Sequence, residues 1–126
     1  WACHGSRLHG SERGSVDREH NGFGGRLRDA NPLRESYERR RMTCGAVTLD
    51  AQSRASVLGT IQDVCRHQSW TLYAAHVRAT QVHVVVEAEP PPEEVMGKVK
   101  AHASRAVNRH AGHNPKRWTR HGSTRR

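Results

Sequence analysis

The chain has 126 residues, which is enough for one domain and too few for two separate hydrophobic cores. Hydrophobic residues make up 34% of it and aromatic residues 5%, and the mean hydropathy is -0.87, so we expect a small core. The net charge is +9, from 21 Lys and Arg against 12 Asp and Glu. Such an excess suggests a polyanionic partner, above all nucleic acid, although a basic protein without such a partner is the alternative.

The sequence also argues against several classes of protein. No apolar run approaches the ~20 residues of a membrane-spanning helix, so we expect no membrane partner, and no signal peptide is visible. The three cysteines (Cys3, Cys44 and Cys65) are odd in number and lack C-x-x-C spacing, which predicts neither a disulfide framework nor a zinc site. We therefore expect a reducing, cytoplasmic compartment. Because the chain starts at Trp1, we expect both ends to be incomplete.

The first half of the chain predicts little regular structure. A strand is expected over residues 1–8, followed by an irregular insertion at about 9–46 that is rich in Gly, Arg, Asp and Asn. Inside this insertion we expect a short charged helix over residues 33–42. Asn31 can cap that helix, and Pro32 suits its first turn.

The second half shows clearer periodicity. Apolar residues three and four apart predict a helix over residues 51–68, with Asp50 as its N-cap. Two strands, over residues 70–77 and 81–88, are close enough to form a hairpin. A last helix is expected from residue 93 to about 110, with acids in its first turn and bases in its last.

This order of elements predicts the fold class. Strand, helix, strand, strand and helix are the first five elements of a ferredoxin-like α+β two-layer sandwich, an antiparallel sheet with helices on one face. The sixth element, a strand, is expected at or beyond Arg126, with a further short strand around Trp118. An unrelated two-layer α+β fold is the alternative. We expect a single domain over residues 1–126.

The positive charge is concentrated at one end of the chain. Residues 1–50 have a net charge of +2 and residues 51–97 a net charge of -2, whereas residues 98–126 carry nine Lys and Arg and no acid. A basic block of this kind is often a solvated tail. Because this block begins inside a patterned helix, we expect instead a structured surface that faces phosphates.

Polar and apolar residues alternate in the strand over residues 81–88. Val82, Val84 and Val86 share one face, which we expect to lie in the core. Gln81 and His83 share the other face, and their spacing allows both side chains to reach one metal ion. Ordinary polar residues on an exposed sheet face are the alternative.

One histidine interrupts the apolar stripe of the last helix. His102 falls between Val99 and Ala106 on the face that we expect to cover the sheet. If this stripe covers the face of Gln81 and His83, His102 lies beside them, and the flanking cations complete a phosphodiester site. A partly buried, hydrogen-bonded histidine is the alternative.

The sequence resembles the single-tyrosine HUH transposases of the insertion-sequence-200-like and REP-associated type. The resemblance extends through nearly the whole chain and is carried by residues 8–18, 37–42, 75–87, 100–106 and 117–125. It implies a ferredoxin-like fold, a bacterial cytoplasmic location and a homodimer as the assembly to expect. It also implies single-stranded or hairpin DNA as the partner, and Mg²⁺ or Mn²⁺ held by two histidines that flank a hydrophobic residue. A tyrosine on the last helix attacks the DNA and forms a phosphotyrosine intermediate.

The signature residues depart from the family pattern. Gln81 stands where the first histidine is expected, His83 matches the second, and His102 stands where the nucleophilic tyrosine is expected. A glutamine oxygen can still bind a hard cation, but the loss of the tyrosine predicts impaired strand transfer. His121 could add a third metal ligand, with a phosphate-contacting or exposed residue as the alternative, and Glu87 is expected to form a salt bridge.

Two functions remain open at this point. The first is a transposase-like domain that binds DNA with impaired chemistry, and the second is a non-enzymatic DNA-binding regulator derived from a transposase. A third is a decayed copy without function. The basic residues that we expect to contact DNA are Lys98, Lys100, Arg105, Arg109, Lys116, Arg117 and Arg120.

Overall fold

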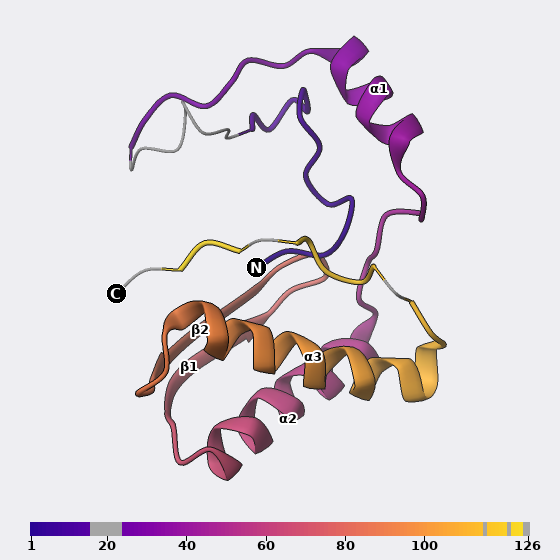
Figure 1. Cartoon of the computed structure of the whole chain (residues 1–126). Coiled ribbons are helices and arrows are strands. Elements are labelled where there is room, and N and C mark those ends of the chain that lie inside the picture. The colour runs from indigo at the N-terminus through magenta and orange to yellow at the C-terminus, as the bar shows by residue number, and fades with distance from the viewer. Residues whose placement is uncertain (16–23, 115, 121, 125–126) are drawn as a thin grey trace.

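The computed structural model describes residues 1–15, 24–114, 116–120 and 122–124. Three helices and two strands follow one another in the order α1, α2, β1, β2, α3. Helices α2 and α3 lie on the same side of the two strands, and α1 stands apart from them (Figure 1). The chain is therefore α+β, a small two-layer sandwich, as the order of elements predicted.

Helix α1 (Pro32–Arg41) forms where its capping residues predicted it. The Oδ1 atom of Asn31 accepts a hydrogen bond of 3.0 Å from the backbone N–H of Arg34, and Pro32 occupies the first turn. The helix has no buried residue. Its local sequence thus determines the helix, and packing against the core contributes nothing to it.

Helix α2 (Ala51–His67) combines a cap with a buried face. The Oδ1 atom of Asp50 accepts a hydrogen bond of 2.7 Å from the N–H of Ser53. Val57 and Ile61 are fully buried, and Val64 is buried beside them. The apolar spacing read from the sequence is therefore the face that packs into the core.

The hairpin of β1 (Thr71–Val77) and β2 (Val82–Glu87) is antiparallel. Its register shifts once, between Leu72 and Ala74, so that the chain bulges at Tyr73. Because strands alternate, the valines of β2 face the helices: Val82 is fully buried, and Val84 and Val86 pack against the same core.

Two further segments extend the pairing beyond the hairpin. Ala2 forms an antiparallel bridge with Gln81, and Cys3 forms one with Trp118. The order across the molecule is therefore β1, β2, the N-terminal segment and the segment around Trp118, which is the strand order expected for a ferredoxin-like sandwich. Only β1 and β2 are full strands among the described residues, so the ferredoxin-like assignment stays a prediction.

The end segments differ from the sequence-based expectation in extent. The strand expected over residues 1–8 makes its last backbone hydrogen bonds to neighbouring segments at His4, with Arg117 and Val47. The chain then turns at Gly5 with φ +72°, where a Cβ atom would lie 2.9 Å from the Cα of Ala46. The bridge at Trp118 lies where the additional short strand was expected.

Helix α3 (Pro92–Ala111) packs against α2 through small and β-branched residues. Its buried residues are Val95, Val99, Ala103, Ala106 and Val107. His102 is exposed, so the expectation that it lies at the centre of the buried stripe was wrong. The stripe centres instead on Ala103, whose small side chain allows the two helices to approach closely.

No helix in the described part of the chain is long and apolar enough to cross a membrane.

Candidate functional site

The face of the sheet that α2 and α3 leave uncovered carries the predicted signature residues. We call it the open face, and define it by Gln81 and His83 of β2, His76 of β1, and Val85. Both histidines are exposed, and Val85 is 59% exposed. His76 is the direct cross-strand partner of His83 in the register of the hairpin. The open face thus presents two imidazoles side by side.

The side chain of Gln81 is hydrogen-bonded to Arg7, a contact that was not predicted from the sequence. With its amide oriented to satisfy both groups, the Oε1 atom of Gln81 accepts hydrogen bonds from Nη2 of Arg7 at 3.0 Å and from Nε at 3.2 Å. A guanidinium group is planar and always charged, so this fork-shaped contact places a positive charge on the amide oxygen.

The donors on the open face do not fit Mg²⁺ or Mn²⁺. These hard cations prefer carboxylate, carbonyl and water oxygens, whereas the predicted pair offers one imidazole and one amide oxygen that already accepts from a cation. Glu87 lies four residues from His83 along β2, and its Oε2 atom accepts a 2.6 Å hydrogen bond from Tyr73. Nowhere among the described residues do three His, Cys, Asp or Glu side chains converge as metal ligands would.

The bond between Tyr73 and Glu87 also replaces an expected interaction. We expected Glu87 to form a salt bridge, and within the described residues it accepts the tyrosine hydroxyl instead. This hydrogen bond, together with the charge of Glu87, raises the pKa of Tyr73.

His102 lies on the other side of the molecule. It lines a groove of about 430 Å³ on the solvent side of α2 and α3, and Val64 and Ala106 contribute to the same groove. The helices cover the valine face of β2, so the condition under which His102 would approach Gln81 and His83 is not met. A single chain does not bring the three signature residues together.

The groove, which we call the helical groove, is lined by basic and polar side chains. Arg105 and Arg109 lie one turn apart on α3, and among the described residues neither forms an ion pair or hydrogen bond. Asp63 is the one acid among the lining residues, and it pairs with Arg66 at 3.1 Å. The lining residues are Thr60, Asp63, Val64, His67, Gln68, His102, Arg105, Ala106 and Arg109.

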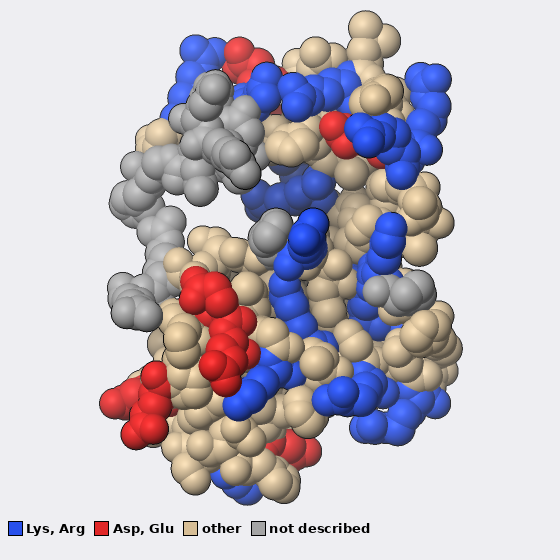
Figure 2. All heavy atoms as spheres, viewed as in Figure 1, with Lys and Arg blue, Asp and Glu red and all other residues tan. Residues whose placement is uncertain are grey.

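The space-filling view shows how the charges divide over this side. Acidic side chains gather where α3 begins, and basic side chains gather along the rest of that helix (Figure 2). Glu93 and Glu94 lie in the first turn of α3, and Arg109 lies in its last. The charge excess read from the sequence is thus a surface of the folded sandwich over most of α3.

The seven basic residues predicted to contact DNA fall into different classes. Arg105, Arg109, Lys116 and Arg120 are exposed. Lys98 is half-buried: its Nζ atom lies 3.3 Å from Glu94 and 5.7 Å from the centre of the Trp70 ring.

Lys100 and Arg117 have structural roles instead. The Nζ atom of Lys100 donates to the carbonyl of Thr119 at 3.1 Å, and burial lowers the pKa of Lys100. Arg117 is only 7% exposed, and it donates to Asn108 at 2.7 Å and to the carbonyl of Gly112 at 3.1 Å. Burial also lowers the pKa of Arg117. Its guanidinium group is not available to a DNA phosphate.

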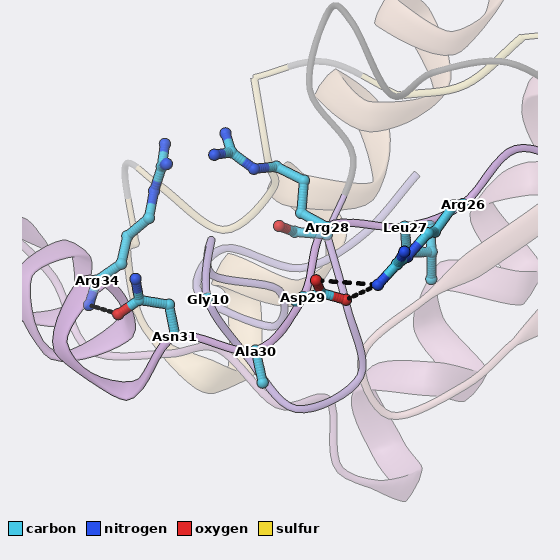
Figure 3. Close-up of a pocket in the computed structure, with 9 residues that line it drawn as sticks. Gly10, Arg26, Leu27, Arg28, Asp29, Ala30, Asn31 and Arg34 are labelled. Atoms are coloured by element: carbon cyan, nitrogen blue, oxygen red, sulfur yellow. Dashed lines mark hydrogen bonds and ion pairs between the residues drawn. The ribbon is translucent and has the colours of Figure 1, made fainter.

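A second hollow, of about 420 Å³, lies in the N-terminal part of the chain beside α1. Arg28 and Arg34 extend into it with their guanidinium groups pointing toward one another (Figure 3). Arg26 is neutralised by a two-pronged ion pair with Asp29 at 2.9 and 3.1 Å. Asp29 thus offsets part of the positive charge of this hollow.

Three residues of these surfaces were not predicted from the sequence. The expected three-residue connection of the hairpin would pair His76 with Val82, whereas the structure has a four-residue connection, which pairs His76 with His83. Arg7 reaches Gln81, and His67 reaches the helical groove, only through tertiary packing, for which the sequence contains no local signal. His121, the suggested third metal ligand, lies outside the described residues.

Comparisons with known proteins add no relative. No protein-family model, no curated protein and no solved structure matches this chain. The function therefore has to be argued from the surfaces described above and from the resemblance of the sequence motifs.

Proposed function

We propose that this chain is a DNA-binding domain derived from a transposase of the single-tyrosine HUH type, and that it binds single-stranded or hairpin DNA without strand transfer. The observation that carries the proposal is the helical groove, in which Arg105 and Arg109 are exposed and, among the described residues, without a carboxylate partner. The resemblance of the motifs supports DNA over other polyanions.

The chemistry of the groove suits a phosphate backbone. Residues four apart on a helix lie side by side, so Arg105 and Arg109 can contact neighbouring phosphates of one strand. Arginine can donate two parallel hydrogen bonds to a phosphate. His67 and His102 line the same groove and can donate further hydrogen bonds. These contacts would fix the position of the strand without reading its sequence.

Two observations favour binding over catalysis. His102, at the position of the family's nucleophile, lines the helical groove, whereas Gln81 and His83 belong to the opposite layer. The open face also lacks the donors that a hard catalytic cation needs. Of the two functions left open by the sequence, the non-enzymatic DNA-binding domain is therefore the better supported.

The test is a binding titration with labelled hairpin, single-stranded and duplex DNA at several salt concentrations. The variant Arg105→Gln/Arg109→Gln removes both groove cations. We expect its affinity for hairpin DNA to fall about a hundredfold or more, since hydrogen bonds to charged groups contribute ~1.5–3 kcal/mol each and two arginines are replaced. The slope of log affinity against log salt should fall by about two, or one for each lost phosphate contact.

A matched control removes the same charge elsewhere. Arg13 and Arg78 are exposed and do not line the helical groove, so Arg13→Gln/Arg78→Gln should bind nearly as the unchanged chain does. Absence of any salt-sensitive complex would overturn DNA binding. Equal losses in both double variants would overturn the helical groove as the binding surface.

A further inference from the structure

The open face holds a pair of imidazoles to which the proposed function gives no role, and the family resemblance concerns only His83, with Gln81 as its partner. His76 and His83 are directly opposite one another on neighbouring antiparallel strands. Side chains in such positions point to the same face, with Cβ atoms about 4.5–5.5 Å apart. Both residues are exposed, so their rings can turn toward a common point above the sheet.

Neither ring is engaged elsewhere. Among the described residues, His76 and His83 take part in no hydrogen bond, ion pair or ring contact, in contrast to His67 and His110, which bond to Asp63 and Ser53. The next cross-strand pair on the same face is Ala74 and Val85, which offers no competing polar group. Both imidazoles are thus free to accept a ligand.

We infer that His76 and His83 form a two-imidazole site for a divalent transition-metal ion of the Cu²⁺, Ni²⁺ and Zn²⁺ class. Neutral imidazole nitrogens suit these ions, whereas Mg²⁺ and Mn²⁺ prefer oxygen ligands. The remaining coordination positions stay open to water or to a ligand from solution. The proposed site therefore pairs His83 with His76 of β1 instead of with Gln81.

The surroundings define the limits of the site. Arg7 holds the amide of Gln81 and places one positive charge at that end of the open face, which disfavours Gln81 as a further ligand. Tyr73 and Glu87 bind one another near the other end of the strands, so their oxygens are also engaged. We therefore expect two protein ligands, and an affinity in the order Cu²⁺ above Ni²⁺.

The site is tested by calorimetric titration of the whole chain with Ni²⁺ at neutral pH. A parallel titration monitors the histidine ring signals by NMR. We expect one equivalent to bind, with the ring signals of His76 and His83 broadened first by the paramagnetic ion. His76→Ala and His83→Ala should each lower the affinity at least tenfold. The double variant should bind Ni²⁺ at least as weakly as either single one, because it retains neither ligand of the site.

Controls separate this site from nonspecific binding to other histidines. His113→Ala changes an exposed histidine outside the open face and should leave the affinity unchanged. An excess of Mg²⁺ should not displace Ni²⁺. The inference is overturned if Ni²⁺ binds the His76→Ala/His83→Ala variant as tightly as the unchanged chain, or if the His76 and His83 signals do not respond. Circular dichroism of each variant verifies that the exposed substitutions leave the fold intact.

Discussion

The two faces of the sandwich differ in what they present to solvent, although both depend on the same hairpin. The helix-covered side buries Val82, Val84 and Val86 beneath α2 and α3, and its outer surface carries a groove lined by arginines. The open face carries His76, His83 and Val85, all three of which are exposed. The basic groove, which includes His102, and the residues Gln81 and His83 therefore belong to opposite surfaces.

Substitutions on the two faces of β2 should differ most strongly in their effect on the free energy of unfolding. Val82→Ala removes a fully buried side chain, and we expect it to lower the free energy of unfolding by about 2–3 kcal/mol through lost burial and the cavity it leaves. Val85→Ala makes the same chemical change on the open face and should cost less than about 0.5 kcal/mol. Urea unfolding of both variants measures the difference. Equal losses would mean that the open face is covered in solution.

Restoring the family signature should have almost no effect. Gln81→His together with His102→Tyr recreates both residue types, but leaves them on opposite layers of one chain. We expect no covalent adduct with hairpin DNA when the products are separated on a denaturing gel. An adduct that requires both changes would show that the two positions meet during the reaction, and would contradict the separation of the faces.

Much of the fold could be predicted from the sequence because its signals are local. The caps at Asn31 and Asp50 marked the starts of α1 and α2, and the alternation of valines from Val82 to Val86 predicted which face of β2 is buried. These features depend on neighbouring residues and on backbone periodicity, so the sequence alone contains them.

The candidate site was less predictable because it depends on which surfaces of the helices and strands pack against one another. The stripe of α3 could be centred on His102 or on Ala103, one residue apart, and only the packing of α2 selects Ala103. Burial of Arg117 requires the acceptors Asn108 and Gly112 at the end of α3, which no pattern around residue 117 indicates. The first outcome depends on the packing of two helices, and the second on how the chain folds back onto the end of α3.

The most direct test of the account is to follow histidine ring signals by NMR while hairpin DNA is added. His67 and His102 report on the helical groove, and His76 and His83 report on the open face. The account predicts large, salt-sensitive shifts for His67 and His102 and unchanged signals for His76 and His83. Shifts confined to His76 and His83 would place the DNA on the open face and contradict the central claim.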